Sequence, residues 1–206
     1  MILISQIIND LIDEDKSLSS ALLKAKVLAS RIQNQELLDW VNNELSGYKN
    51  EENLPSYRRK IKNELKGDFV NANMNYTNAK ISTDGLEKSF EKSLKRTDFT
   101  ESIISLERLI NSEEASIKSE SIKADFVTLI EENWRKMGNP LLKIKFVNKS
   151  ISKISVIQVV TNVRNKLLDV MLELDGKYSD FTELKDLKIK SEEISSIVNN
   201  TIYQEH

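Results

Sequence analysis

Glycine and proline are scarce in this chain, and their scarcity limits its possible folds more than any other feature. Five Gly and two Pro occur among 206 residues, whereas these two residue types make up roughly 12% of average proteins. Sandwiches and barrels of many strands need turn residues at each connection. We therefore expect an α+β fold that is predominantly α-helical.

Apolar residues recur with helical spacing at the start of the chain. Residues 4–12 repeat at i, i+3, i+4 and i+7, and residues 18–45 keep the same period behind Ser17, which can cap a helix. Gly47 ends the second segment. These segments predict an N-terminal helical hairpin.

A small antiparallel sheet is expected around residues 58–82, where polar and apolar residues alternate in two or three short strands. Lys66-Gly67-Asp68 indicates a turn or a bulge within it. Residues 142–147 also alternate, and they form either another strand or the flank of the next helix.

Further helices are expected in the second half of the chain. Asp84 and Thr100 can cap two short helices, and a third is expected over residues 119–137, before Gly138-Asn139-Pro140.

A long helix is expected near residues 152–175, ended by Gly176. A polar linker follows, and residues 191–200 form a short C-terminal helix. We therefore expect one domain over residues 1–176 and an extension over residues 177–206.

Several classes of chemistry are excluded by composition. The chain has no cysteine, and its single histidine is the last residue, His206. Thiol nucleophiles, Cys-ligated metals and a serine triad therefore have no residues to use. Phosphate-loop and dinucleotide motifs are also absent from the sequence. We expect no metal, no cofactor and no catalytic residue.

Charge and hydropathy indicate a cytoplasmic protein. Lys and Arg number 30 against 32 Asp and Glu, a formal net charge of −2, which argues against a general nucleic-acid binder. The apolar runs are shorter than the roughly 18 residues of a membrane span, so no membrane contact is expected.

The most basic local stretch could bind nucleic acid or an acidic partner. On a strand, alternation would place Arg58, Lys60 and Lys62 on one face. A solvated hairpin edge protected by its lysines is the favoured alternative. The cations of this stretch are Arg58, Arg59, Lys60, Lys62 and Lys66.

A nuclease is the sharper version of this hypothesis. Metal-dependent nucleases pair an acidic residue with Glu-x-Lys, and Glu64-Leu65-Lys66 lies close to Asp68. A chain this rich in Glu and Lys shows such tripeptides by chance, and Glu183-Leu184-Lys185 is a second one. The tripeptide is therefore weak support for catalysis.

Arg164-Asn165 invites comparison with the Arg-Asn-x-x-x-His motif of HEPN-type ribonucleases. Asp169 stands at the histidine position, and a carboxylate cannot replace imidazole as the acid and base near neutral pH. An active HEPN ribonuclease is thus argued against. An inactive HEPN-like helix is one alternative, and the favoured one is a structural helix in which Arg164 pairs with an acidic neighbour such as Asp169 or Glu173.

Trp40, Tyr48 and Trp134 could form a recognition surface. Their helical spacing favours packing in a core or an interface instead.

Longer stretches of the sequence resemble the AbiTii domain family of bacterial abortive-infection proteins, which limit phage spread. The most specific block covers residues 11–31 and 37–48, and Leu54-Pro55-x-Tyr57-Arg58 with Gly67 fits the same pattern. Residues 102–107 and 163–169 add shorter matches. The resemblance covers about residues 1–175.

The resemblance implies a phage-defence role and supplies no catalytic motif. Residues 197–203 resemble the segment that leads into a further C-terminal region in longer relatives. The chain is then either a minimal form or one that ends at a domain border.

We expect a non-enzymatic interaction, sensing or oligomerisation domain that associates with itself or with a protein partner. Such a domain should use an exposed apolar stripe of the first or the long helix. The competing hypothesis is an effector that binds or cleaves nucleic acid through the basic hairpin Arg58–Lys66.

Overall fold

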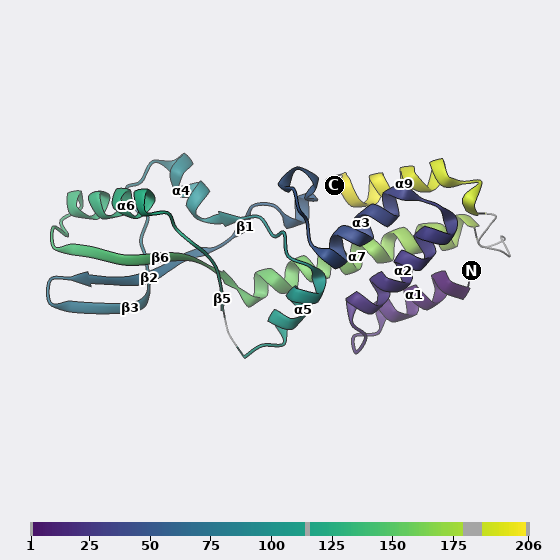
Figure 1. The fold of residues 1–206 in the computed structure, drawn as a ribbon, viewed down its shortest axis with the longest axis horizontal. Helices are drawn as coiled ribbons and strands as arrows, with labels where there is room; N and C mark the ends of the chain where they lie inside the picture. The colour runs from purple at the N-terminus through teal and green to yellow at the C-terminus, as the bar shows by residue number, and fades with distance from the viewer. Residues whose placement is uncertain (1, 114–115, 179–186, 205–206) are drawn as a thin grey trace. The chain divides into compact units, whose positions relative to one another are not determined.

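The computed structural model describes residues 2–113, 116–178 and 187–204 and has an α+β fold that is predominantly helical, as expected (Figure 1). The chain forms two compact units. Unit 1 comprises Met1–Arg59, Thr100–Ser112 and Val156–His206, and unit 2 comprises Lys60–Phe99 and Glu113–Ser155.

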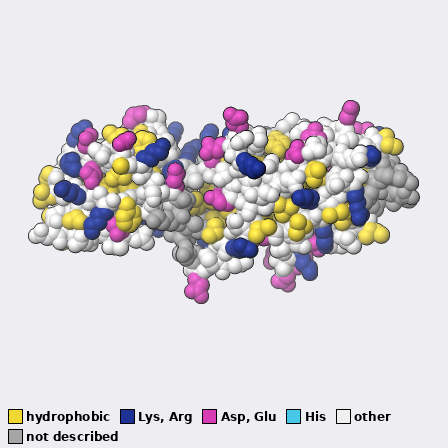
Figure 2. Space-filling view, in the orientation of Figure 1, with side chains coloured by type: hydrophobic (Ala, Val, Ile, Leu, Met, Phe, Trp, Pro, Cys, Tyr) yellow, Lys and Arg dark blue, Asp and Glu magenta, His cyan; other side chains and the backbone are white. Residues whose placement is uncertain are grey.

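The two units carry opposite net charges. Unit 1 has 14 Lys and Arg against 20 Asp and Glu, a formal charge of −6, and unit 2 has 16 against 12, a formal charge of +4. The net charge of −2 therefore conceals a basic unit. Figure 2 shows basic and acidic side chains intermixed on the face that it presents, so the excess is not one continuous basic surface on that face.

Unit 1 is helical. Its helices pack apolar faces such as Ile4 and Ile7 of α1 and Leu22 and Leu28 of α2, all fully buried. Two 3₁₀ turns, η1 (Glu51–Asn53) and η2 (Ser56–Arg58), follow the third helix. The helices are α1 (Ile2–Ile12), α2 (Leu18–Ile32), α3 (Gln35–Ser46), α5 (Ile103–Ile110), α7 (Lys153–Tyr178, of which residues 153–155 belong to unit 2) and α9 (Ser191–Tyr203).

The expected N-terminal hairpin is formed by α1 and α2, but its second helix, expected over residues 18–45, is two helices. Gln33 adopts a left-handed conformation with φ of 54°, and the Asn34 side chain accepts a hydrogen bond from the Leu37 amide at 2.9 Å. Asparagine is a strong N-cap. The chain therefore ends α2 and starts α3 within two residues, while Gly47 ends α3 as predicted.

Three other helix ends differ from expectation. Ser102 and not Thr100 caps α5, and Glu87 and not Asp84 caps α4 (Lys88–Leu94). Helix α7 continues through Gly176 to Tyr178. Gly176 has no positive φ, and nothing lies within 4 Å of an added Cβ. It is therefore an ordinary helical residue and not a helix end.

Unit 2 contains two antiparallel sheets. The first pairs β1 (Ile61–Lys62) with β4 (Arg96–Thr97). The second has the strand order β3-β2-β6-β5. Its strands are β2 (Glu64–Asn71), β3 (Met74–Lys80), β5 (Ser116–Ser121) and β6 (Leu142–Ser152).

Two predictions are decided by this sheet. Residues 142–147 belong to a strand, β6, which extends to Ser152. The helix expected over 119–137 starts later, as α6 (Ala124–Lys136), because residues 116–121 pair with β6. The pairing with a distant strand overrides the local pattern there.

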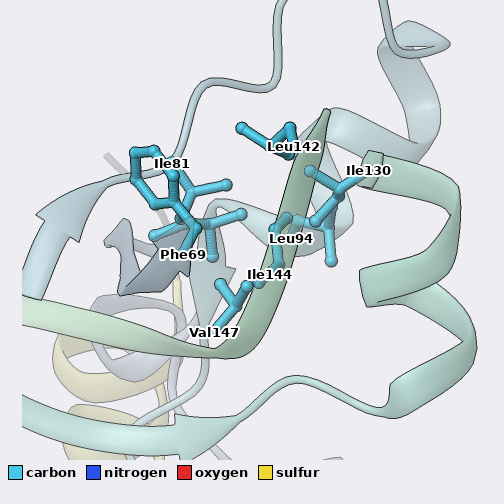
Figure 3. Packing of buried hydrophobic residues seen from close by; sticks show 8 residues of the cluster. Phe69, Ile81, Leu94, Ile130, Leu142, Ile144 and Val147 are labelled. Atoms are coloured by element: carbon cyan, nitrogen blue, oxygen red, sulfur yellow. The ribbon is translucent and has the colours of Figure 1, made fainter. Parts of the chain in front are cut away.

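One face of the four-stranded sheet is covered by α4 and α6 (Figure 1). Alternation along β2 turns Leu65 and Phe69 into this core, where Ile130 of α6 and Leu94 of α4 meet them (Figure 3). The opposite face of β2 therefore carries Glu64, Lys66 and Asp68.

Gly67 lies in the middle of β2 and not at the hairpin turn. The turn is at residues 72–73, where Ala72 has φ of 52°. The β2–β3 register shifts between Gly67 and Phe69, so a bulge lies there. A Cβ at Gly67 would stand 2.1 Å from the Phe146 carbonyl oxygen, so glycine permits the close approach of β6.

Within the described ranges, none of the helices combines the length and apolar character that a membrane crossing requires.

Candidate functional site

The basic stretch does not form one strand face. Arg58 lies in η2, and β1 begins only at Ile61. The predicted alternation of Arg58, Lys60 and Lys62 is therefore wrong. Arg58 and Arg59 belong to unit 1, whereas Lys60, Lys62 and Lys66 belong to unit 2.

Arg58 is fully buried and bound to Glu44 of α3, whose side chain is also fully buried. Arg58 Nε donates to both carboxylate oxygens, at 3.1 and 3.2 Å, and Nη2 donates to Oε2. Nη1 donates to the Glu101 carbonyl oxygen at 2.9 Å. The guanidinium also lies 5.2 Å from the Tyr48 ring centroid.

Two tyrosines and a tryptophan complete the network around Glu44. Tyr48 and Tyr57 donate their hydroxyls to Glu44 Oε1 at 2.7 and 2.8 Å, and Trp40 Nε1 donates to the Tyr57 oxygen at 2.8 Å. Trp40 and Tyr48 thus lie in the core of unit 1, with exposed fractions of 0% and 6%.

The electrostatics of this network favour one charge state. Burial and the Glu44 carboxylate raise the pKa of Tyr48 and of Tyr57 well above the ordinary range, so both hydroxyls stay protonated. Burial opposes the charge of Arg58, but the nearby carboxylate outweighs it and raises the pKa of the guanidinium. Every donor has an acceptor, so the network holds the chain between residues 44 and 58 in place.

Arg59 and Lys60 have different surroundings. Arg59 donates to the carbonyl oxygens of Leu54 and Glu52, at 2.6 and 2.8 Å, and so braces the two 3₁₀ turns. Lys60 is exposed, has φ of 55°, and donates its backbone amide to Asp98 at 2.6 Å.

Lys62 and Lys66 line a hollow of unit 2 that we call the lysine hollow. Its volume is about 1020 Å³, and all of its lining residues belong to unit 2. Lys80 and Lys95 are the other two cations. The complete lining is Lys62, Asn63, Glu64, Leu65, Lys66, Lys80, Ile81, Ser82, Thr83, Asp84, Lys95, Ser150, Ser152 and Ser155.

The carboxylates at the lysine hollow are already engaged. Glu64 contacts the Lys80 ammonium at 3.2 Å and the Lys66 ammonium at 4.0 Å. Asp84 accepts from the Ser82 hydroxyl at 2.6 Å. Glu91 lies outside the lining but binds two lining residues: hydrogen bonds from Lys95 and Thr83 lower its pKa, so this carboxylate is a weaker base than an ordinary glutamate.

The walls of the lysine hollow are held by the main chain. Asn63 donates its side-chain amide to the Leu94 carbonyl at 3.0 Å, and Trp134 Nε1 donates to the Ser82 carbonyl at 2.7 Å. Ser152 Oγ accepts from the Ser155 amide at 3.2 Å, as an N-cap of α7 does. The lysines and hydroxyls are thus carried by anchored segments.

The residues on which the nuclease hypothesis depends share one strand face but do not form a metal site. Glu64, Lys66 and Asp68 lie on the same side of β2, but Asp68 Oδ1 accepts from the Asn78 amide at 2.8 Å. Among the residues that the structure describes, no group of three or more acidic or histidine side chains is arranged to hold a metal ion. The second tripeptide, Glu183-Leu184-Lys185, lies outside the described residues.

A family model for AbiTii matches residues 2–200. The chain belongs to the AbiTii family. Membership indicates a bacterial abortive-infection protein that acts in phage defence. No curated protein and no solved structure is similar enough to this chain to match it.

In this AbiTii-family chain the residues compared with the HEPN motif have separate surroundings. Arg164 donates to the carbonyl oxygens of Leu11 and Lys16, at 2.8 and 2.9 Å, and so caps the C-terminal end of α1. Among the described residues Arg164 forms no ion pair with Asp169 or Glu173. Residues five apart on a helix point about 140° apart, and Asp169 instead borders a shallow hollow beside Lys166 and Asn200.

Sequence reasoning missed Glu44, Tyr57, Lys80, Lys95 and Ser150 as members of these two clusters. Glu44 precedes Tyr48 by one helical turn, and that spacing is the only local signal of the network. The residues of the lysine hollow come from β1, β2, β3, β6 and the segments after them, so no local pattern joins them.

Proposed function

We propose that the chain is a non-enzymatic interaction and sensing domain that acts in the bacterial cytoplasm during abortive infection. The observation that supports this proposal is the state of the carboxylates at the lysine hollow. The two carboxylates that line the hollow, Glu64 and Asp84, are engaged by the Lys80 ammonium and by the Ser82 hydroxyl, so the described hollow offers mainly hydrogen-bond donors for binding.

The competing effector hypothesis loses a residue on which it depended. Arg58 has no accessible surface with which to contact a phosphate backbone. Arg59 is braced against carbonyl oxygens. Binding by the remaining lysines stays a prediction.

The proposal is tested by incubating the purified chain with single- and double-stranded RNA and DNA and with nucleoside triphosphates. We expect no hydrolysis above that of buffer. Glu64→Gln serves as the matched variant, because it removes the only acid of the Glu-x-Lys tripeptide. Hydrolysis that the parent chain catalyses and the Glu64→Gln variant loses would refute the proposal.

We also propose that the domain associates with a second copy of itself through α2 of unit 1, in place of the first or the long helix that the sequence indicated. Leu23 and Val27 lie one turn apart on α2 and are 55% and 45% exposed. Light scattering after size exclusion tests this, with Leu23→Lys and Val27→Lys as the disrupting changes and Lys26→Ala as the control on the same helix. If the parent chain has the molar mass of a monomer both at high concentration and after 100-fold dilution, the proposal is contradicted.

A further inference from the structure

The lysine hollow contains ammonium and hydroxyl groups that form no hydrogen bond with the described residues. Lys66 is 27% exposed, and its nearest carboxylate, Glu64, is 4.0 Å away, beyond hydrogen-bonding distance. Lys62 has no ion-pair partner among the described residues. Two ammonium groups are therefore available on the wall of one hollow.

Ser150 supplies a third donor, and it is the more telling one because it is buried. Its side chain lines the hollow while the residue is only 8% exposed. No hydrogen bond to its hydroxyl is formed by any described residue. Buried hydroxyls are normally paired. Every fully enclosed polar side-chain atom of the described chain has a partner. The unpaired Ser150 hydroxyl must therefore have accessible surface, and it opens into the hollow that Ser150 lines.

The chemistry that fits these donors is a phosphate group. Phosphate oxygens accept several hydrogen bonds at once, and lysine binds them as a point charge. Unit 2 as a whole carries a formal charge of +4, which attracts an anion. Ser152 and Ser155 at the start of α7 also border the hollow, and the first turn of a helix carries a partial positive charge.

The surface around the hollow favours a small molecule over a nucleic-acid strand. A volume of about 1020 Å³ matches the upper range of small-molecule sites. Lys66, Asp68 and Val70 follow one another on the same face of β2, and Val70 pairs with Lys143 of β6. Asp68 therefore lies between Lys66 and Lys143. An acid in that position interrupts the continuous row of cations that a phosphate backbone needs.

We propose that the lysine hollow binds a phosphorylated small molecule, with Lys62, Lys66 and the Ser150 hydroxyl holding its phosphate. This inference rests on the proposed binding role of the domain and names the ligand class for it. Lys80 and Lys95 adjoin the site and form ion pairs with Glu64 and Glu91. When the ligand carries more than one phosphate, these lysines exchange their carboxylate partners for its further phosphates.

The test uses the full chain and isothermal titration calorimetry at 150 mM salt. The probes are inorganic phosphate, AMP, ATP and a 12-nucleotide single-stranded DNA. We expect ATP to bind more tightly than AMP, and AMP more tightly than inorganic phosphate. Replacing Lys62 and Lys66 with Gln should weaken ATP binding about tenfold or more, and Ser150→Ala about threefold.

The matched control is the Lys143→Gln, Lys145→Gln pair, which removes two lysines of the same sheet outside the hollow and should change ATP affinity less than about twofold. Lys66→Arg keeps the charge and should retain most of the affinity. The melting temperature of each variant without ligand identifies any variant that fails to fold, and the single variants Lys62→Gln and Lys66→Gln then replace the double variant in the comparison.

Three outcomes would overturn the inference: no binding of any small phosphorylated probe at millimolar concentration, equal losses in the hollow and control variants, or a clear preference for the oligonucleotide. Turnover of ATP in the same titration would refute the non-enzymatic function and leave the site intact. Absence of binding without turnover would refute the site alone.

Discussion

Arg58 and Glu44 form an ion pair in which neither side chain has accessible surface. A buried charge that loses its partner typically costs about 3–5 kcal/mol.

Arg58→Ala should lower the free energy of unfolding by about 3–5 kcal/mol, because it leaves the Glu44 carboxylate buried without its cation. Arg59→Ala, one residue along, should cost only about 1 kcal/mol, because that side chain is partly exposed and binds neutral carbonyl groups. Urea unfolding measures both. Similar small losses in the two variants would show that the ion pair is not buried in solution.

A glycine pair tests the bulged strand. Gly67→Ala should destabilise the protein by about 3 kcal/mol, since the new methyl would collide with the Phe146 carbonyl. Gly176→Ala should stabilise it by about 0.5–1 kcal/mol, because α7 is continuous there and nothing lies within 4 Å of an added Cβ. Thermal unfolding of both variants gives the answer, and a neutral Gly67→Ala would contradict the β2–β6 packing.

The break between α2 and α3 depends on Asn34. Its side chain caps α3 and also donates to the Ser191 carbonyl and the Ser195 hydroxyl of α9, at 3.1 and 2.9 Å. Asn34→Ala should therefore cost about 2 kcal/mol, more than the roughly 1 kcal/mol expected for Ser17→Ala, an exposed cap of α2. Chemical denaturation of the two variants compares them, and equal costs would argue against the link to α9.

Stability should fall as the pH rises above about 10, the ordinary pKa of tyrosine. In the folded protein the raised pKa values keep Tyr48 and Tyr57 protonated, whereas both ionise in the unfolded chain. Their stabilisation is thus complete below pH 10 and is lost as the pH climbs toward the folded-state values.

Tyr48→Phe should make this alkaline decline shallower, at a cost of about 1–2 kcal/mol near pH 7 for the lost hydrogen bond. Tyr76→Phe, at an exposed position on β3, should leave the decline unchanged. Unfolding free energies at pH 7, 9, 10 and 11 test this, and parallel curves for all three proteins would exclude the two buried tyrosines as its cause.

The helices and the first sheet strands were predictable because their signals are local. Spacing in residues 4–12 and 152–175 reflects the one apolar face of a helix, and alternation in residues 64–70 reflects the two faces of a sheet. The α2–α3 break was missed because apolar spacing continues on both sides of Gln33. Strand β5 was missed because its partner, β6, lies about 30 residues away in sequence.

Composition and short-range periodicity were enough to predict the helical class of the fold and to exclude thiol and internal imidazole chemistry, and the family followed from long stretches of matching residues. The fate of the basic stretch depended on tertiary contacts. Glu44, on a different element, draws Arg58 into the core of unit 1, while the strands of unit 2 bring Lys62 and Lys66 beside Ser150. Contacts between distant segments set which charges are paired and which line the lysine hollow, and no local pattern encodes them.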